Sequence, residues 1–352
     1  MSTEDIAVVI LNWNGKKYLE KFLPSIIENS GNAEIIVADN DSTDDSVSFV
    51  QANFPSVQII VNNQNGGFSK GYNDALKHVE AKFYMLLNSD IEVTPNWLDP
   101  LLTVMKDERV AGCQPKVLAY NNKTSFEHAG ASGGFLDNNY FPFCRGRIFM
   151  SVEEDLGQYN GTTEVFWATG ACLLIRSELF HKAGGFDEDF FAHMEEIDLC
   201  WRLKKQNYAF MVCPSSTVYH IGGGTLPYSS PQKVYLNFRN SIAMIFKNHE
   251  GPIFFKLMGR LTLEGFAALR FLLAGEFKQF YAVFRAHMWF HANTFKLFKK
   301  RKAVKQMSTE FNATGLYKGN ILWDYFFKGA NTYSKLNQRL FNDFKKKSTA
   351  KS

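Results

Sequence analysis

The feature that most constrains this chain is the regular alternation of strand-like and helix-like segments over its first 90 residues. Short apolar runs typical of buried parallel strands occupy residues 6–11, 35–38, 57–61 and 83–87. Between them, segments with helical periodicity or capping residues occupy residues 16–29, 42–52 and 69–79. This alternation predicts an α/β fold built on a Rossmann-like, mostly parallel, doubly wound sheet.

Polar side chains follow each of the four predicted strands. They form four clusters: Asn12–Asn14, Asp39–Asp41, Asn62–Gly67 and Asn88–Asp90. Because ligands of open parallel sheets bind beyond the carboxyl ends of the strands, these clusters predict a single site at that edge of the sheet.

The remainder of the chain divides near residue 230. Residues 110–225 mix strand-like pieces (165–175, 209–213 and 217–220) with a helix predicted over residues 195–205. Everything after Pro231 is predicted to be helical, up to a lysine-rich tail at Lys345–Lys351 that is predicted to be disordered. We therefore expect a catalytic domain over residues 1–230 and a basic, aromatic-rich α-helical extension over residues 231–352.

The formal net charge of +4 hides a strong asymmetry. Residues 1–230 contain 17 Lys and Arg against 29 Asp and Glu, whereas residues 231–352 contain 22 against 6. The balances of −12 and +16 predict that the second segment meets an anionic partner, either lipid or nucleic acid. Since no nucleic-acid-binding motif accompanies the basic residues, we expect an anionic membrane surface and no nucleic acid.

Cysteine usage and the N-terminus indicate the compartment. The five cysteines have no C-x-x-C spacing, which predicts buried thiols in a reducing cytosol rather than disulfides or a zinc site. The acidic N-terminus runs directly into the first strand, so no signal peptide is predicted, and no uncharged apolar stretch of about 18 residues predicts a spanning helix. We expect a cytoplasmic protein that is peripheral on the inner face of the cell membrane.

Two loops have the composition of a nucleotide site. Asp39 opens the string DNDSTDDS, and its carboxylate can accept a hydrogen bond from the N3–H group of uracil or thymine, although acids and hydroxyls here also cap the next helix. The loop NQNGGFSKGYN over Asn63–Asn73 contains glycines that let a backbone approach a ligand, and the helix after it offers its N-terminus to a phosphate. This loop matches neither the P-loop nor the G-x-G-x-x-G fingerprint, so it is a weak signal by itself.

Asn88 and Asp90, after the fourth strand, are suited to a divalent metal ion. Mg²⁺ and Mn²⁺ prefer oxygen ligands and leave coordination positions open for substrate phosphates. His220 ends a later strand and is the natural third ligand beside such an ion. The alternatives are a simple turn residue at Asp90 and a structural histidine at position 220.

The string DEDFFAHMEEIDLCWR over Asp187–Arg202 places acidic residues at a helix start. If the helix begins near Glu195, then Glu195, Asp198 and Arg202 share one face, and Glu196 projects to the side. The helix dipole favours an ionised carboxylate there, which can take a proton from an attacking hydroxyl. The alternative is a solvated acidic helix start.

Taken in order, these strings resemble the family 2 glycosyltransferases of GT-A fold, most closely the bacterial rhamnosyltransferase-like branch. The matching segments lie between residues 5 and 245 and read VVILNWNG, ADNDSTDDS, NNQNGGFSKGYN, LLNSD, WATGACLLIR, GGFDEDFFAHMEEIDLCWRL and VYHIGGG. The resemblance implies an inverting transfer of a sugar, with the help of Mg²⁺ or Mn²⁺, from a nucleotide-diphosphate donor to a hydroxyl of a glycan or lipid-linked acceptor. It favours rhamnose from dTDP-rhamnose, or a hexose from a UDP-sugar.

The resemblance also implies roles for individual residues. The nucleotide-sugar would be bound by Asn12, Asn14, Asp39, Asn65, Gly67, Asn73, Asn88 and Asp90, with Asp39 on the base. Asn88 and Asp90 occupy the D-x-D metal motif, and His220 the metal-binding histidine. Glu196 occupies the position of the catalytic base, beside Glu195 and Asp198. The acceptor or sugar would be faced by Trp167, Thr169, Gly170 and Arg202.

This sequence departs from the family pattern at two of these positions. Asn88 replaces the first carboxylate of D-x-D, so metal binding is expected to depend mainly on Asp90 and His220. Glu196 stands where the family more often has Asp, which lengthens the base by one methylene. Neither change removes the chemistry.

The segment from Tyr235 to Lys302 interleaves aromatic and basic residues at helical spacing and ends in the cluster FKLFKKRK. Basic helices with an aromatic face are typical of interfacial membrane elements, but such stripes also pack on a catalytic body, and both alternatives stay open. Two rival functions are a nucleotidyltransferase and a non-catalytic nucleotide-binding protein. The first would carry a Gly-rich, basic loop after the first strand, where this chain reads NWNGKKY.

Overall fold

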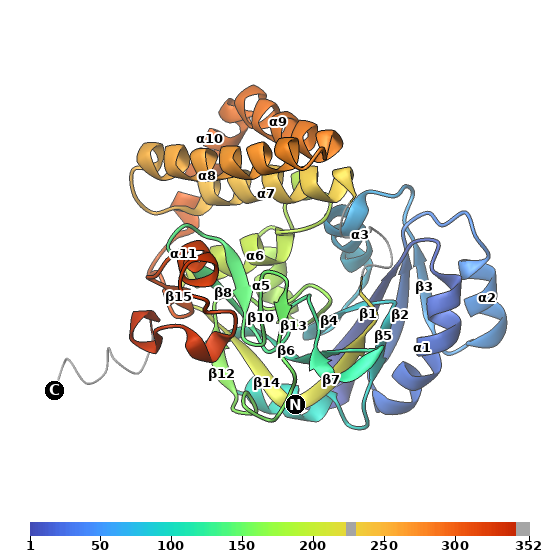
Figure 1. Cartoon of the computed structure of the whole chain (residues 1–352). Helices are drawn as coiled ribbons and strands as arrows, with labels where there is room; N and C mark the ends of the chain where they lie inside the picture. The colour runs from blue at the N-terminus through green and yellow to red at the C-terminus, as the bar shows by residue number, and fades with distance from the viewer. Residues whose placement is uncertain (223–229, 343–352) are drawn as a thin grey trace.

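A ten-stranded sheet forms the centre of the molecule, and its first four strands are parallel. β1 (Ile6–Asn12) lies between β2 (Glu34–Asp39) and β4 (Phe83–Asn88), and β3 (Gln58–Val61) forms the edge beyond β2. The structure is a computed structural model that describes residues 1–222 and 230–342 (Figure 1). The strands are connected by α1 (Lys16–Asn29), α2 (Ser46–Asn53) and α3 (Gly67–Ala75), as the alternating pattern predicts.

The second part of the sheet is mixed. β13 (Cys172–Arg176) is antiparallel to both β4 and β6 (Val110–Ala119), and β14 (Ala209–His220) is parallel to β6. The short strands β5 (Ile91–Val93), β7 (Asn122–Phe126) and β12 (Thr163–Val165) pair along these strands. β14 unites two strands predicted separately, since a shift of register separates Cys213 from Thr217. The single strand predicted over residues 165–175 is instead two strands with an irregular stretch between them.

β1 shows why the central strands are apolar without alternation. Ala7 and Val9 enter the core on one face of the sheet, while Ile6, Val8 and Ile10 enter the core on the other, against α1. All five are almost completely buried. A strand covered on both faces needs apolar residues at every position, so the run IAVVIL correctly predicted an interior strand.

A smaller five-stranded sheet lies beside the main one and includes the end of the described chain. It contains β8 (Gly134–Asp137), β9 (Pro142–Cys144), β10 (Arg147–Ile148), β11 (Ser151–Val152) and β15 (Leu316–Tyr317). The prediction that everything after Pro231 is helical is therefore wrong for residues 308–342, where α11 (Ile321–Phe326) is a short helix beside β15. β15 pairs in parallel with β8, so the chain returns to the α/β body after its helical segment.

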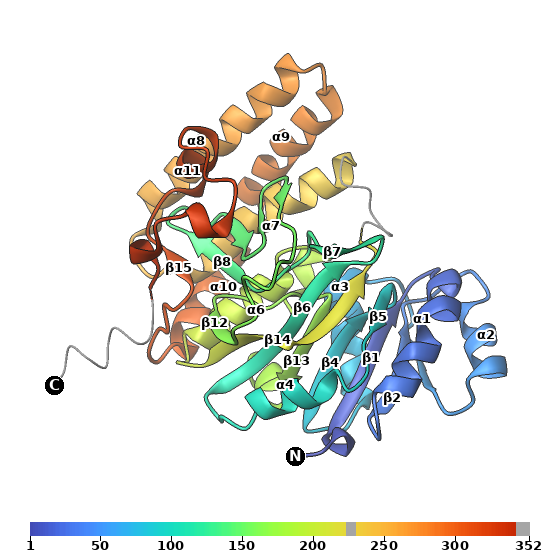
Figure 2. The same ribbon diagram turned by 60° about the horizontal axis from the view of Figure 1, so that its bottom comes forward.

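Four long helices follow one another in the described part of the extension: α7 (Pro231–Asn248), α8 (Ile253–Leu273), α9 (Phe277–Ala292) and α10 (Thr294–Met307). The Ser230 hydroxyl accepts a hydrogen bond from the Lys233 amide, and Pro231 occupies the first helical position, a favourable start for α7. The helices stack at one end of the molecule, with α7 toward α3 and α6 (Glu195–Lys204) (Figures 1 and 2). The predicted disordered tail, Lys345–Lys351, lies outside the described residues.

The cysteines and the apolar helices bear on the expected compartment. All five cysteines are buried free thiols. Among residues 1–222 and 230–342, no helix combines the length and the apolar character needed to cross a bilayer. The remaining helices, α4 (Leu98–Val104) and α5 (Ser177–Lys182), complete the covering of the sheet.

Candidate active site

The ends of β1 and β2 form one wall of the candidate site. Asn12 donates from Nδ2 to Asp39 Oδ2 (2.8 Å), and the Ser42 amide donates to Asp39 Oδ1 (2.8 Å). Asn14, with φ 49°, accepts from the Thr43 amide at 2.7 Å. Asp39 is only 1% exposed, and each of its carboxylate oxygens already accepts a hydrogen bond from the protein. It therefore shapes the loop after β2, and only the remaining lone pairs of these oxygens are available to a ligand.

The start of α3 is built differently from the expectation. Gly67 has φ +75°, and a Cβ there would lie 2.5 Å from Phe191, so only glycine fits. Asn65 Oδ1 accepts from the Gly67 amide (2.9 Å) and braces this turn. The Phe68 and Ser69 amides both donate to the Phe191 carbonyl, at 2.6 and 3.2 Å. The expectation that this N-terminus offers its amides to a phosphate is therefore wrong, because a backbone carbonyl already occupies them.

Asn73 also serves the protein rather than a ligand. Its side-chain amide bonds both backbone groups of Phe186, accepting from N–H and donating to C=O at 2.9 Å each. It thereby ties α3 to the loop before the acidic helix. This pairing removes Asn73 from the surface expected to border a ribose or diphosphate.

Asn88, Asp90 and His220 meet as the sequence predicts. His220 Nε2 lies 3.1 Å from Asp90 Oδ1 and 3.4 Å from Asn88 Nδ2, while His220 Nδ1 lies 3.2 Å from Glu127 Oε2. Burial opposes the charged imidazole, but the carboxylates of Asp90 and Glu127 outweigh it and raise the pKa of His220 to about 10. Sequence reasoning missed Glu127, which is 4% exposed and follows β7. Its one signal is the adjacency of two polar residues, Glu127 and His128, after a strand.

This donor set fits a hard divalent cation. A carboxylate oxygen of Asp90 and the side-chain amide of Asn88 lie 3.1 and 3.4 Å from His220 Nε2, close to the separation of neighbouring ligands in an octahedral site, and an ion here would displace the proton of that nitrogen. The orientation of the Asn88 amide is an assignment, and its oxygen can take the place of Nδ2. Within the described parts of the chain, no three His, Cys, Asp or Glu side chains are arranged to hold a metal. Any ion here would therefore complete its coordination with substrate oxygens or water.

The acidic helix begins where the sequence predicts, after a strained turn. Phe191, His193 and Met194 have φ of 60°, 72° and 72°, an unusual concentration of left-handed residues that are not glycine. Asn240 of α7 holds this turn by donating to the carbonyls of Phe190, Ala192 and His193, at 2.7–2.9 Å.

Glu195 and Glu196 open α6 with their side chains in a poorly hydrated setting. One carboxylate oxygen of each, Oε2, is buried without a hydrogen-bond partner. Burial raises the pKa of Glu196 to about 7, against opposing hydrogen bonds from backbone amides. Burial and the neighbouring Glu196 raise the pKa of Glu195 well above its usual value. A carboxyl whose pKa lies near neutral pH is suited to general base catalysis.

A short chain of contacts joins Glu196 to the Asn88–Asp90 cluster. A Cβ on Gly170 would lie 3.5 Å from Glu196 Cβ, so Gly170 packs directly against the glutamate. The next residue, Ala171, accepts a hydrogen bond from the Asn88 amide at 2.9 Å. In register, Leu11 of β1 pairs with Asn88, and Asn12 pairs with Asp39. The structure thus brings Asn12, Asp39, Asn88, Asp90, His220 and Glu196 to one edge of the sheet.

Four other predicted residues lie in the interior instead. Trp167 is 4% exposed and donates from Nε1 to the Phe135 carbonyl, and Thr169 is 2% exposed and bonded to Gln114 and Ala171. Asp198 and Arg202 form a buried ion pair (2.8 Å). The expectation that these side chains meet a substrate does not match their placement, because their polar groups already have partners inside the protein.

The Asp198–Arg202 pair has a supporting function. Arg202 donates to the carbonyls of Ala183 and Gly185, while Asp198 accepts from Asn248 and Lys247 of α7. The pair therefore fixes α6 to a Gly-rich bend at residues 183–186 on one side and to the helical extension on the other. Helical spacing places Asp198 and Arg202 on one face but does not reveal that the pair is buried.

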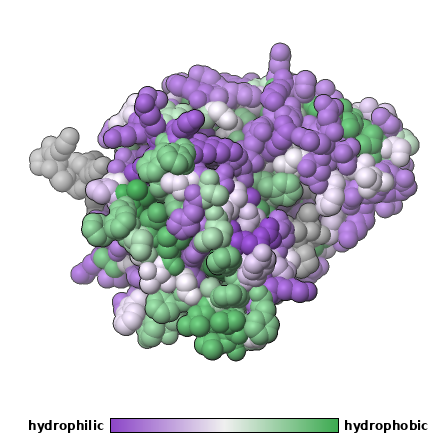
Figure 3. All heavy atoms as spheres, turned by 90° about the horizontal axis from the view of Figure 1, so that it is seen from above, coloured by the Kyte–Doolittle hydropathy of each residue, from purple (hydrophilic) through white to green (hydrophobic). Residues whose placement is uncertain are grey.

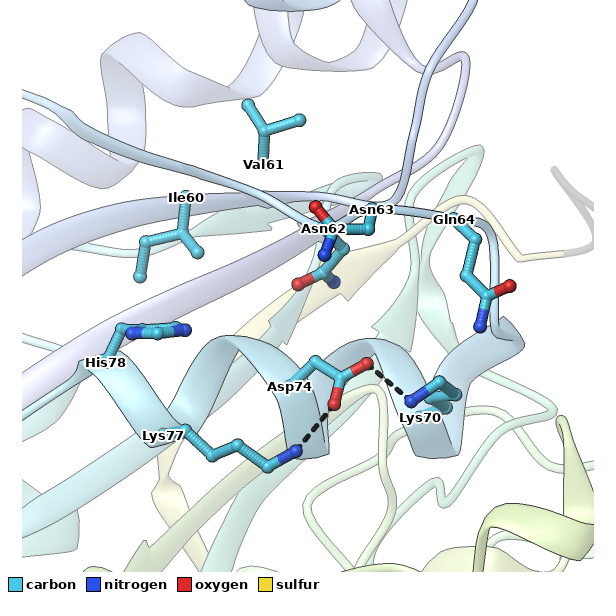
Figure 4. Close-up of a pocket in the computed structure, with 9 residues that line it drawn as sticks. All are labelled: Ile60, Val61, Asn62, Asn63, Gln64, Lys70, Asp74, Lys77 and His78. Atoms are coloured by element: carbon cyan, nitrogen blue, oxygen red, sulfur yellow. Dashed lines mark hydrogen bonds and ion pairs between the residues drawn. The ribbon is translucent and has the colours of Figure 1, made fainter.

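Two cavities of the described structure lie away from Glu196 and the Asn88–Asp90–His220 cluster, although Asn62 lines the first and Asn73 and Arg202 line the second. One, of about 330 Å³, lies between β3 and α3 and contains the Lys70–Asp74–Lys77 ion pairs (Figure 4). The other, of about 380 Å³, lies between the Gly-rich bend and α10. Among the described residues, buried side-chain atoms without a hydrogen-bond partner include Asn12 Oδ1, Glu195 Oε2 and Glu196 Oε2 of the predicted site, and others elsewhere such as Arg147 Nε and Trp201 Nε1. Such atoms are uncommon in proteins, and the three in the predicted site are free to bond a polar ligand.

Comparison with known proteins identifies the family of this chain. Residues 7–184 match the model of the glycosyl transferase family 2. The chain is 23% identical to an N-acetylglucosaminyl-diphospho-decaprenol L-rhamnosyltransferase of Mycobacterium tuberculosis, over 76% of this chain and 92% of that protein. It is also 23% identical to rhamnosyltransferase WbbL of Escherichia coli K12, over 61% and 83% of the two chains.

Solved structures agree on the fold. A mannosyltransferase, PcManGT, from Pyrobaculum calidifontis, solved with GDP-Man and Mn²⁺, aligns with a TM-score of 0.51 at 14% identity, over 86% of this chain and 83% of that one. GalNAc-T7, solved with UDP, GalNAc and Mn²⁺, aligns with a TM-score of 0.53 at 16% identity, over 69% and 47%. The predicted GT-A fold with helices following the sheet is confirmed, and the chain belongs to glycosyl transferase family 2 as a rhamnosyltransferase-like glycosyltransferase.

Proposed function

We propose that this chain is an inverting, metal-dependent glycosyltransferase in which Glu196 is the catalytic base. The observation that carries the proposal is the state of that side chain. Its carboxylate has a buried oxygen without a partner, its pKa lies near neutrality, and it packs on the segment that contacts Asn88. A base in this state has a free oxygen that can accept a hydrogen bond from an arriving acceptor hydroxyl.

The proposed reaction proceeds by one displacement. Glu196 takes the proton of the acceptor hydroxyl as its oxygen attacks the anomeric carbon, and the bond from that carbon to the diphosphate oxygen breaks on the opposite face. The nucleoside diphosphate leaves with the electron pair, and the anomeric configuration is inverted. Asp90, His220 and the Asn88 amide would hold Mg²⁺ or Mn²⁺, which supplies neutralisation of the charge on the departing diphosphate.

The donor is proposed to lie over the ends of β1 and β2. The loop after β2, shaped by Asn12, Asn14 and Asp39, would receive the base, with Asp39 using its remaining lone pairs. Gly170, which touches Glu196, would border the sugar. The similarity to two rhamnosyltransferases favours rhamnose from dTDP-rhamnose, and a hexose from a UDP-sugar is the second candidate.

The acceptor is proposed to be a lipid-linked saccharide used in cell-envelope glycan synthesis. The name of the mycobacterial relative includes a diphospho-decaprenol acceptor, and a low-salt glycan biosynthesis hexosyltransferase of Haloferax volcanii is also 23% identical. An acceptor with a lipid anchor places the enzyme at a membrane surface. We therefore propose peripheral association with the cytoplasmic face, supported by the +16 balance of residues 231–352.

A donor panel tests the proposal directly. Purified protein is incubated with dTDP-rhamnose, UDP-hexoses and GDP-mannose, with and without Mn²⁺, and thermal shift and donor turnover are measured. We expect one nucleotide-sugar to raise the melting temperature only when Mn²⁺ is present, and to be transferred or slowly hydrolysed. Binding without any turnover would instead support the non-catalytic rival.

A further inference from the structure

Helix α8 exposes large apolar side chains to solvent and buries charged ones. Its buried positions are Arg260, Glu264 and Ala268, at 6%, 1% and 9% exposure. Its exposed positions are mostly large and apolar: Phe254, Phe255, Met258, Phe266, Leu269, Leu272 and Leu273. A helix on the surface of a protein in water has the opposite arrangement.

The most deeply buried side chains of α8 are polar because they form a satisfied network with α7 and α9, beside the partly buried Ile253, Leu257 and Leu261. Arg260 pairs with Glu264 (2.7 Å) and donates to the Ser241 hydroxyl of α7 (2.7 Å). His287 of α9 lies 3.0 Å from the other Glu264 oxygen. These pairs fix the rotation of α8 about its own axis. Its apolar side therefore faces outward because the buried polar contacts hold it there.

The apolar surface continues onto the neighbouring helices. Phe277, Tyr281, Phe284 and Met288 of α9, and Phe295 and Phe298 of α10, are 45–86% exposed. In the view onto this end of the molecule, hydrophobic atoms gather in a patch along its lower edge, while hydrophilic atoms dominate the upper part (Figure 3). Exposed apolar patches of this kind are rare on monomeric proteins and mark an interaction surface.

The charges around this surface select its occupant. Residues 251–307 contain 11 Lys and Arg but only two acidic residues, and one of these, Glu264, is buried. Two lysines of the FKLFKKRK cluster form ion pairs within the protein, since Lys296 and Lys300 pair with Asp187 and Asp189. Exposed bases such as Arg270, Lys278 and Lys299 remain beside the apolar residues. Apolar side chains with a basic border match an anionic lipid surface.

We infer that the outer face of α8, with the adjoining aromatic residues of α9 and α10, enters the acyl boundary of an anionic bilayer. This deepens the proposed membrane association by assigning its affinity chiefly to apolar insertion, with the basic residues adding attraction to headgroups. Its test needs no glycosyl transfer, so it succeeds or fails separately from the proposed enzyme activity.

The test is co-sedimentation of the full chain with phosphatidylglycerol/phosphatidylethanolamine vesicles. The variant is Phe255→Ser/Phe266→Ser/Leu273→Ser, three exposed residues of α8. The matched control is Leu156→Ser, which is 80% exposed on a different part of the molecule. Circular dichroism checks that both variants are folded, which is expected because no core residue is changed.

We expect the triple variant to lose roughly a hundredfold in vesicle partitioning and the control to be unchanged. Wild-type binding is expected to persist at about 1 M salt, where the screening length is only about 3 Å. Binding that disappears at that salt, or a folded triple variant that binds like wild type, overturns the inference. A wild-type dimer without vesicle binding would assign the face to a second copy and overturn it equally.

A different observation carries a second inference, about the strained turn before Glu195. Asn240 Nδ2 donates to three carbonyls of this turn, and Arg239 donates to the carbonyls of Asp189 and Phe190 at 2.7 and 2.9 Å. The conformations of Phe191, His193 and Met194 are intrinsically unfavourable and persist only when surrounding contacts impose them. We propose that Asn240 is a positioning residue that sets the direction in which α6 presents Glu196.

Asn240→Asp tests this, because it keeps the shape of the side chain but turns a carboxylate toward three carbonyl oxygens. The control is Asn237→Asp, the same change on the same helix at a half-buried position. We expect Asn240→Asp to lower kcat at least tenfold with little change in donor affinity, and to move the acid limb of the pH–rate profile; Asn237→Asp should change neither. Loss of donor affinity in parallel with kcat, at an unchanged pH profile, would show a merely structural residue and overturn the proposal.

Discussion

Replacing Glu196 by glutamine should increase the stability of the protein in alkaline solution. Burial raises the pKa of Glu196 from its usual 4.5 to about 7, so the folded state binds a proton between these pH values that the unfolded state has released. Folding stability therefore falls as the pH rises from below 4.5 through 7, because the ionised carboxylate is poorly accommodated. The difference in pKa corresponds to about 3 kcal/mol, which is fully lost above pH 7.

Glutamine has nearly the shape of glutamate and carries no charge, so Glu196→Gln removes this loss. We expect the variant to match wild type near pH 4 and to exceed it by up to about 3 kcal/mol at pH 8. Urea denaturation followed by circular dichroism at several pH values measures the difference. Glu178→Gln, an exposed glutamate on α5, serves as the isosteric control and should change stability at neither pH. Equal stability of Glu196→Gln and wild type at pH 8 would show that no strained, desolvated carboxylate lies at this position.

Four further outcomes are expected. For wild type, kcat/KM should rise with pH through about 7 and then level, because the base must be ionised; a profile flat from pH 5 to 8 would exclude Glu196. Asp90→Asn should abolish the Mn²⁺-dependent part of the donor-induced thermal shift, as should His220→Ala, whereas Asp74→Asn, in the cavity of Figure 4, should leave it intact. Gly67→Ala should cost about 1–3 kcal/mol in urea denaturation, since φ +75° and the contact with Phe191 both oppose a side chain, and a neutral result would contradict the close packing of this turn against Phe191. Asp187→Ala should cost about 1–3 kcal/mol at neutral pH, because Lys247 and Lys300 each lose one carboxylate partner and keep only Asp198 and Asp189. Although burial opposes ionisation, these lysines hold the pKa of Asp187 well below its usual value, so the cost should shrink as wild type is acidified through that lowered pKa; a pH-independent cost would contradict the pairing.

The sheet and its ligand edge were predictable because they depend on local patterns. Fully apolar runs such as Ile6–Leu11 are typical of interior strands, and the polar clusters after parallel strands meet at one edge of the sheet. The pairing of His220 with Asp90 also follows, once both are recognised as strand ends.

What the sequence does not reveal is which polar residues are already satisfied by the protein. Asn73, Asp198 and Arg202 have the residue types of a site, yet Asn73 and Asp198 bond segments far away in the chain and Arg202 bonds the carbonyls of Ala183 and Gly185. The α3 N-terminus is likewise filled by the Phe191 carbonyl, through a contact between residues more than 120 positions apart. Periodicity also places the apolar stripe of α8 correctly but not its direction, which is set by the tertiary partners of Arg260 and Glu264.

The proposed enzyme depends on Glu196 acting as a base on a donor held at the Asn88–Asp90 end of the same site. Single-turnover transfer by Glu196→Gln, measured beside its affinity for the donor with Mn²⁺, tests this most directly. We expect donor affinity within about twofold of wild type and a transfer rate lowered by about 10²–10⁴-fold. A variant that transfers the sugar at the wild-type rate, or one that no longer binds donor, would contradict this role of Glu196.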